Sequence, residues 1–285
     1  MLTEASQSDV ALSNSSSVVT KTPILNEGTV EFKREEILEY FHRTFSLYES
    51  IFDCLVDDDA YYARANMLRH PLIFYYGHTS VFYVNKLNVA KLINERIDPH
   101  LESTLAIGVD EMSWDDLNEA HYDWPTPAKV KAYRDKTREI VDKFIRSCDF
   151  TLPIQWDDPM WVIMMGIEHE RIHLETTAVL IRELPLDKVK AHDVWSKICT
   201  EVGTAPVNEL LDVEGGTIEY GKDKSNPLYG WDNEFGHAEA TIKPFKASKY
   251  LVSNSEFLEF VEAGGYRTRS YWDDEGWALG SIREG

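Results

Sequence analysis

The sequence predicts an α+β protein that begins with a four-helix bundle and continues into a smaller region of mixed strands and helices. Two observations favour this fold class. Across residues 31–185, apolar residues recur every three or four positions in four long segments, which is the period of an amphipathic helix. Beyond these segments, glycine becomes common and short stretches alternate between apolar and polar residues, as strands do. We therefore expect two structured regions in this chain of 285 residues.

The first 30 residues are rich in Ser and Thr and poor in large apolar side chains. Such a composition cannot bury enough surface to offset the entropy lost on ordering, so residues 1–30 are expected to be a disordered tail. The first ten residues carry acidic groups instead of a basic stretch followed by an apolar one, which is not the pattern of a signal peptide. Three scattered cysteines are too few for a disulfide framework, and we expect a reducing, cytoplasmic location.

The charge balance excludes two classes of function. The chain has 29 Lys and Arg residues against 49 Asp and Glu residues, a formal net charge of −20. Because so acidic a surface binds polyanions poorly, we expect neither nucleic acid nor an acidic membrane surface as a partner. The longest uninterrupted apolar stretches, such as residues 160–167, are far shorter than the ~20 residues that span a bilayer.

The four helical segments have recognisable starts and stops. The first begins near Glu31, and the other three begin at Pro71, Pro127 and Pro159. A proline suits the first turn of a helix, where its missing N–H would have no partner. The fourth segment ends before Pro185. Four long amphipathic helices in one region predict a four-helix bundle.

The second region follows a linker at residues 186–212. Within residues 213–285, the stretches 217–220 and 241–243 alternate as strands do, and a capping box opens a short helix at residues 257–263. We therefore expect a mixed domain with long loops.

The sharpest chemical feature is a pair of histidines in the fourth helical segment. His169 and His173 are four residues apart, so both imidazoles lie on one face of the helix, one turn apart. Two imidazoles placed in this way can chelate one metal ion, although two histidines that only pack on a half-buried face would show the same spacing. The apolar run that precedes the pair favours metal binding.

His78 is the best candidate for a third ligand. It lies in the second helical segment among large aromatic residues that would bury it, next to Gly77, which suits close helix contact. A buried imidazole without a partner is costly, so His78 either hydrogen-bonds a neighbour or binds a metal, and the sequence leaves both open. Three neutral ring nitrogens fit Zn²⁺ or Fe²⁺, and the residue types do not choose between them.

The same stretch matches the His-Glu-x-x-His pattern of zinc proteases, in which Glu170 would be the general base. The elongated form of that pattern needs a glycine and a third histidine where this chain has Thr176 and Val179. The other form uses a downstream glutamate, for which Glu183 is available. A zinc protease therefore remains an alternative.

Further residues could line such a site. Arg134 and Arg138 are four apart on the third helical segment, where they form either a solvated basic face or a contact to a substrate carboxylate. Tyr75 and Tyr76 precede His78 and would ordinarily be core residues, but one of them could line the site, and we take Tyr76 as the candidate for substrate binding. The remaining histidines have no partner at metal-ligand spacing, and we interpret them as structural or surface residues: His42, His70, His100, His121, His192 and His237.

At His78 and at the string from His169 to Glu175, the sequence resembles the DinB-like bundle of the non-haem iron sulfoxide synthases. Those enzymes make the sulfur–imidazole bond in ergothioneine and ovothiol biosynthesis. The strings at residues 68–79 and 164–176 look more like the ovothiol branch, the 5-histidylcysteine sulfoxide synthases, than like the ergothioneine branch.

The second region resembles the partner domain of the same family. Residues 230–236 and 252–257 look like the opening of a domain similar to formylglycine-generating enzymes, the sulfatase-modifying factors, which have a C-type-lectin-like fold. The resemblance extends from about residue 31 to residue 285, and the order of the two domains agrees.

The resemblance implies a cofactor and a reaction. His78, His169 and His173 would be the facial ligands of Fe(II), and the other positions would take a cysteine thiolate, a histidine imidazole and dioxygen. The substrates would be histidine, cysteine and O₂, and the product would be a sulfoxide that joins the cysteine sulfur to C5 of histidine. Glu175 belongs to the motif but lies about 200° around the helix from His173, so it is not expected to be a ligand.

One departure from the family keeps alternatives open. The lectin-like domain of the family is much longer than the region that follows the bundle here, and the ovothiol branch often adds a methyltransferase domain. We therefore expect a truncated lectin-like domain. The alternatives are an ergothioneine-type synthase acting on trimethylhistidine, a DinB-like metal-dependent thiol transferase, and an inactive remnant.

Overall fold

The structure is a computed structural model, and it describes residues 21–66, 68–106, 122–197, 200 and 203–282. The described residues have an α+β fold, which confirms the predicted fold class. The chain divides into two compact units: the helical region up to Lys197 with residues 223–235, and residues 198–222 with 236–285. No helix in the described part of the chain combines the length and the apolar character that a membrane span needs.

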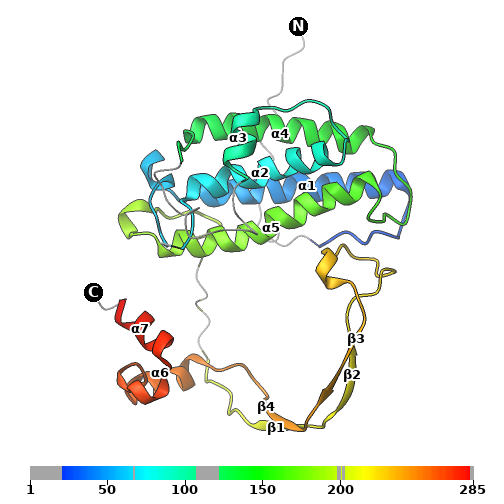
Figure 1. The fold of residues 1–285 in the computed structure, drawn as a ribbon. Coiled ribbons are helices and arrows are strands. Elements are labelled where there is room, and N and C mark those ends of the chain that lie inside the picture. The colour runs from blue at the N-terminus through cyan, green and yellow to red at the C-terminus, as the bar shows by residue number, and fades with distance from the viewer. Residues whose placement is uncertain (1–20, 67, 107–121, 198–199, 201–202, 283–285) are drawn as a thin grey trace. The chain divides into compact units, whose positions relative to one another are not determined.

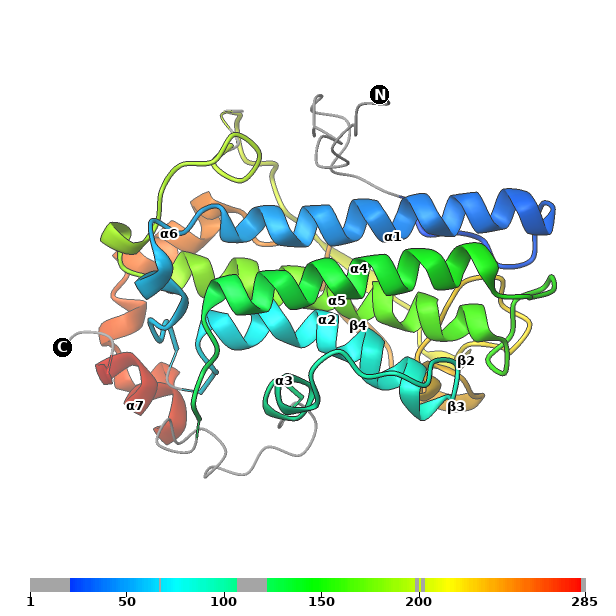
Figure 2. The same ribbon diagram turned by 90° about the horizontal axis from the view of Figure 1, so that it is seen from above.

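Four long helices that lie side by side form the first unit (Figures 1 and 2): α1 (Val30–Phe52), α2 (Leu72–Val89), α4 (Pro127–Ser147) and α5 (Pro159–Glu183). α1 and α2 each pack on both α4 and α5. A short helix, α3 (Pro99–Thr104), packs on α2. The four predicted helices are all present, and those predicted at prolines begin at that proline or directly after it.

Side chains at the helix starts explain these boundaries. The Thr126 hydroxyl accepts the backbone N–H of Lys129 at 3.2 Å, and the Asp158 carboxylate accepts that of Met160 at 2.8 Å. Each cap satisfies an N–H group that has no partner within the helix, and a proline follows it in the first turn.

The segment before α1 packs on the bundle. Leu25 is 2% exposed; its N–H donates to the carbonyl of Pro227 at 2.7 Å, and its carbonyl accepts the N–H of Ile154 at 2.9 Å. In the expected tail of residues 1–30, residues 1–20 lie outside the described residues, and the structure orders the part around Leu25. The few large apolar side chains of this Ser/Thr-rich stretch form no periodic pattern, so the sequence did not indicate this contact.

Residues 223–235 also pack on the bundle, although the sequence pattern places them in the second region. The buried Tyr229 ring lies 4.9 Å from that of Trp161 on α5, measured between ring centroids. Phe235 lies 6.5 Å from the same tryptophan ring, and Trp231 lies 5.4 Å from Tyr229. Large aromatic side chains bury much apolar area, which explains why this short stretch stays on α5.

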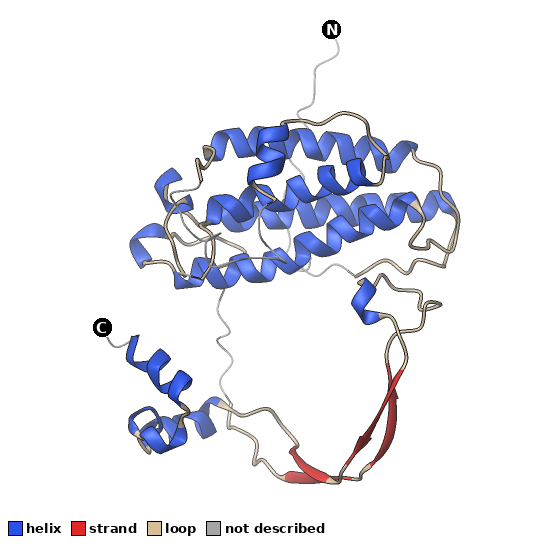
Figure 3. Cartoon of the chain, viewed as in Figure 1, coloured by secondary structure: helices blue, strands red, loops and turns tan. Residues whose placement is uncertain are grey.

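In its described residues, the second unit has two antiparallel strand pairs (Figure 3): β1 (Leu210–Val213) with β4 (Phe245–Ser248), and β2 (Gly216–Tyr220) with β3 (Ala238–Ile242). In the first pair Leu210 lies opposite Ser248, and in the second Gly216 lies opposite Ile242. The predicted strand 217–220 falls within β2, and the one at 241–243 falls at the end of β3.

Two helices, α6 (Asn254–Glu262) and α7 (Asp274–Ile282), follow the strands. The predicted capping box is present: the Ser253 hydroxyl accepts the N–H of Glu256 at 3.2 Å, and the Glu256 carboxylate accepts the N–H of Ser253 at 2.8 Å. Because Ser253 is itself the N-cap, α6 begins earlier than the predicted helix at residues 257–263.

Candidate metal centre

The structure brings together the three histidines singled out in the sequence. His78 comes from α2, and His169 and His173 come from α5; one ring nitrogen of each lies within 4.8 Å of those of the other two. The Nε2 atoms of His169 and His173 are 3.1 Å apart. Among the described residues this is the one group of three potential ligands at such distances. The spacing of four residues on α5 and the packing of α2 against α5 together produce the cluster.

The orientation of His78 is fixed by a backbone carbonyl. Its Nδ1 lies 2.7 Å from the carbonyl oxygen of Leu105, just after α3. A carbonyl can only accept, so Nδ1 carries the proton and Nε2 keeps the lone pair that a metal would use. Histidine ligands of metals commonly donate their second N–H to such an oxygen, which sets the tautomer and the plane of the ring.

Aromatic rings stack on two of the three imidazoles. Phe74 stacks on His78 with ring centroids 4.9 Å apart and planes 20° apart. Phe82 stacks on His169 at 3.7 Å and 9°. Phe74, His78 and Phe82 are spaced by four residues along one face of α2. These phenyl rings restrict rotation of the imidazoles and exclude water from their faces.

Burial keeps the α5 imidazoles neutral. Desolvation, with the neighbouring imidazoles as a second cause, lowers the pKa of His169 well below its usual value and lowers that of His173 to about 3. The Nδ1 atoms of both rings are buried and have no hydrogen-bond partner among the described residues. Neutral imidazole is the form that binds a metal, so this set of donors fits a divalent ion that accepts nitrogen ligands, such as Zn²⁺ or Fe²⁺.

Glu170 follows His169 but is directed into the core. Its carboxylate accepts Arg134 Nη2 at 2.9 Å, the Thr79 hydroxyl at 3.1 Å and the Tyr83 hydroxyl at 3.2 Å. Burial raises the pKa of Glu170, and the guanidinium of Arg134 limits that rise. Both carboxylate oxygens are already engaged by donors of the protein, which argues against the general base that the zinc-protease alternative requires.

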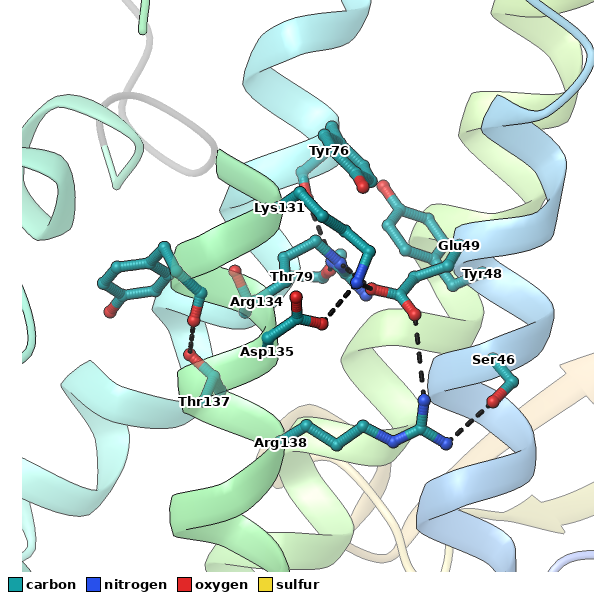
Figure 4. A network of polar contacts seen from close by, with 12 residues as sticks. Ser46, Tyr48, Glu49, Tyr76, Thr79, Lys131, Arg134, Asp135, Thr137 and Arg138 are labelled. Atoms are coloured by element: carbon teal, nitrogen blue, oxygen red, sulfur yellow. Dashed lines mark hydrogen bonds and ion pairs between the residues drawn. The ribbon is translucent and has the colours of Figure 1, made fainter. Parts of the chain in front are cut away.

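Arg134 is fully buried, so the solvated basic face considered from the sequence is wrong for this residue. Its Nε donates to Glu49 at 3.0 Å, and its Nη1 donates at 2.9 Å both to the Tyr76 carbonyl and to the Thr79 hydroxyl (Figure 4). All three guanidinium nitrogens therefore donate to the protein. Substrate binding by Arg134 stays a prediction.

Arg138 lies one turn further along α4 and contacts α1. Its Nε donates to Nδ1 of His42 at 3.0 Å. Its Nη2 donates to the Ser46 hydroxyl at 2.8 Å, as Figure 4 shows. Tyr76 is buried, and its ring lies 4.6 Å from that of Phe52. Substrate binding by Arg138 and Tyr76 stays a prediction, since these contacts are with the bundle itself.

Some contacts of the site were not predicted from the sequence. The ring of Tyr75, rather than that of Tyr76, faces His173, with centroids 5.8 Å apart. The stacking of Phe82 was missed, although its spacing of four residues from His78 was a usable signal. The Leu105 carbonyl was also missed, and a backbone oxygen leaves no signal in residue types. Of the other histidines, His121 lies outside the described residues.

Comparison with known proteins identifies both regions. Residues 40–177 match the DinB superfamily, and residues 197–283 match the sulfatase-modifying factor enzyme 1-like domain. A DinB-like helical domain is thus followed by a sulfatase-modifying factor-like domain. These matches confirm the two-domain resemblance and the order of the domains, and the three histidines lie within the residues that match the DinB superfamily.

Several curated relatives align with this two-domain chain. Ergothioneine biosynthesis protein 1 of Schizosaccharomyces pombe is 21% identical over 250 residues, which are 76% of this chain and 32% of that protein. Hercynine oxygenase of Mycolicibacterium smegmatis is 31% identical over 155 residues, which are 53% of this chain and 33% of that protein. The alignments thus cover about a third of the length of these relatives. The inactive C-alpha-formylglycine-generating enzyme 2 of Bos taurus is 33% identical over 70 residues, 25% of this chain and 22% of that protein.

Proposed function

We propose that this protein acts as a non-haem iron sulfoxide synthase that joins the sulfur of a small thiol to the imidazole of a histidine. The observation that carries the proposal is the convergence of three imidazoles from α2 and α5, within 4.8 Å of one another, in a buried site. The relatives named for ergothioneine biosynthesis and hercynine oxygenation support the same reaction class. The overall reaction removes the thiol S–H and one imidazole C–H, adds one oxygen atom of O₂ to sulfur, and releases the other as water.

His78, His169 and His173 would hold the metal. Bound Fe(II) would pass electrons from the substrates to O₂ and would offer open coordination positions to a thiolate. The protein contributes orientation and a dry environment. The Leu105 carbonyl holds the proton on Nδ1 of His78, and the Phe82 ring shields one face of His169 from water.

For the substrates we propose histidine and cysteine, with attachment at C5, because the sequence strings around the ligands look most like the ovothiol branch. An ergothioneine-type reaction on trimethylhistidine is the second candidate, favoured by the relatives named for ergothioneine biosynthesis and hercynine oxygenation. A thiol substrate must stay reduced, so we place the reaction in a reducing compartment such as the cytoplasm. The proposal includes no nucleic-acid or membrane partner.

The test is anaerobic loading of the 285-residue chain with Fe(II), followed by O₂ and one of four substrate pairs. Histidine or trimethylhistidine would be combined with cysteine or γ-glutamylcysteine, and products read by mass spectrometry. We expect an adduct of the two substrates that carries one extra oxygen atom, and no adduct from the His169→Ala variant. The substrate pair that reacts identifies the branch.

Other outcomes would support the alternatives. Thiol consumed equally well without O₂ would favour the thiol transferase. One equivalent of bound iron with no adduct from any pair would favour a metal-binding but inactive protein. A chain that binds no divalent metal would contradict the proposal, because the reaction requires an ion bound by the three histidines.

A further inference from the structure

We propose that Arg134 and Glu170 are positioning residues for the metal centre: their buried ion pair sets the relative register of α2 and α5, so that the three imidazoles converge. The inference rests on the proposed function only in taking His78, His169 and His173 as metal ligands. It assigns to Glu170 a role other than the general base that the local sequence pattern suggests.

Arg134 connects α4 to the three other long helices of the bundle. Its Nε donates to Glu49 on α1 at 3.0 Å (Figure 4). Its Nη1 donates to Thr79 on α2, and its Nη2 donates to Glu170 on α5, both at 2.9 Å. A planar guanidinium holds its partners in fixed directions, so displacement of any one helix would break at least one of these bonds.

The bonded residues are the immediate neighbours of the ligands. Thr79 follows His78 on α2, and Glu170 follows His169 on α5. The Thr79 hydroxyl also donates to Glu170 at 3.1 Å, so the two ligand helices are tied together next to their ligands. One residue of slip along a helix axis is ~1.5 Å. Metal–ligand distances must hold within about 0.2 Å, so this register matters for binding.

The surroundings of the pair suit a directional role better than a contribution to stability. Both side chains are fully buried, and Arg134 lies over the ring of Phe45 at 4.2 Å from its centroid. Glu170 accepts a further bond from the Tyr83 hydroxyl at 3.2 Å. Buried ion pairs add little net stability compared with apolar residues of similar size, whereas their hydrogen bonds select one arrangement of the surrounding groups.

Another arginine of the bundle provides a matched control. Arg34 on α1 donates to the carbonyl of Cys148, just after α4, at 2.9 Å and lies over the Phe150 ring at 4.9 Å. It therefore links α1 to the end of α4 through its guanidinium, but it contacts neither ligand helix through these bonds. Loss of Arg34 should weaken the bundle without changing the register of α2 against α5.

The experiment is a titration of the metal-free 285-residue chain with Co(II), read by the visible absorption of the bound ion. Three variants are compared with the wild type: Glu170→Gln, the double variant Arg134→Met with Glu170→Leu, and Arg34→Gln. Far-UV circular dichroism checks that each is folded. A single change leaves one member of the ion pair buried without the other. The double variant removes both members, so it is expected to fold even where a single variant does not.

We expect Glu170→Gln and the double variant to bind Co(II) about 10- to 100-fold more weakly than the wild type, with a changed absorption band. Arg34→Gln should bind within about threefold of the wild type, with an unchanged band. Folded variants that lack the pair and yet bind with the affinity and band of the wild type would overturn the inference. A wild-type chain that binds no Co(II) would instead overturn the proposed function, and this inference with it.

Discussion

Nη2 of Arg134 lies 2.9 Å from Oε1 of Glu170, and neither side chain is exposed to solvent. The pair lies between α4 and α5, one residue beyond His169. The same Glu170 completes a local match to a zinc-protease pattern, but its carboxylate is held by donors of the core. The ion pair therefore distinguishes this chain from a zinc protease, in which the same glutamate of the His-Glu-x-x-His pattern would be free to act as a general base.

Removing one member of this pair should cost far more stability than removing both. In Glu170→Ala, Arg134 keeps Glu49 but loses its fully buried partner, and we expect a loss of about 3–5 kcal/mol in the free energy of unfolding. In the double variant Arg134→Met with Glu170→Leu, neither member of the pair is left buried without the other. Glu49 loses Arg134 but is 17% exposed and keeps Arg138 at 3.8 Å, so the loss should be much smaller. Urea denaturation followed by circular dichroism measures both. A single variant that is as stable as the double would show that the pair is not desolvated in solution.

The sequence predicted the helices and the histidine pair of α5 because both depend on local spacing. A proline after a capping residue indicates the start of a helix whatever the tertiary packing around it, as at Pro127 and Pro159. The separation of His169 and His173 by four residues fixes their common face before any packing is known. The aromatic neighbours of His78 indicated that its side chain is buried, and the resemblance to the sulfoxide synthases implied that it joins the pair.

The environment of Arg134 depends on tertiary packing and could not be predicted in the same way. Arg134 and Arg138 are four apart on one helix and have the same side chain, yet the side chain of the first is 0% exposed and that of the second 28%. The difference arises from how α4 is rotated against α1 and α2. The contact of the Leu105 carbonyl could not be predicted from the sequence either, because every residue has a backbone carbonyl.

Gly77 should be needed for the orientation of His78. A Cβ at this position would overlap the side chain of Leu105. The backbone carbonyl of the same Leu105 lies 2.7 Å from Nδ1 of His78. We expect Gly77→Ala to destabilise the chain by about 1–3 kcal/mol through overpacking. We also expect it to weaken Co(II) binding by about 10-fold, because the partner of the ligand moves.

Gly203→Ala is the control for that substitution, since nothing lies within 4 Å of a Cβ placed there. It should match the wild type in both stability and Co(II) affinity. Unchanged Co(II) affinity in Gly77→Ala would mean that the Leu105 carbonyl does not determine the orientation of the ligand.

Metal binding should stabilise the bundle, because an ion held by α2 and α5 binds the folded state only. At a free Co(II) concentration 100 times the Kd, the gain is ~2.7 kcal/mol. For a bundle of this size, this gain corresponds to a rise in Tm of about 5–10 °C. A thermal melt with and without Co(II) measures the shift, and a chelator should reverse it.

His169→Ala and His42→Ala separate the metal site from histidines elsewhere in the bundle. His42 hydrogen-bonds Asp142 at 2.7 Å and is not in the three-histidine group. The rise in Tm should disappear in His169→Ala and persist in His42→Ala. A shift that survives in His169→Ala would place the stabilising ion at another site.

The aromatic stretch at residues 223–235 should contribute to the stability of the bundle, although its sequence lies within the sulfatase-modifying factor-like domain. Tyr229 is 7% exposed and packs on Trp161, so we expect Tyr229→Ala to lower the free energy of unfolding by about 3 kcal/mol. Tyr271→Ala is the matched control, because Tyr271 is 64% exposed and should cost less than about 0.5 kcal/mol. Urea denaturation followed by tryptophan fluorescence, which includes Trp161, measures both. Equal effects of the two substitutions would mean that residues 223–235 leave α5 in solution.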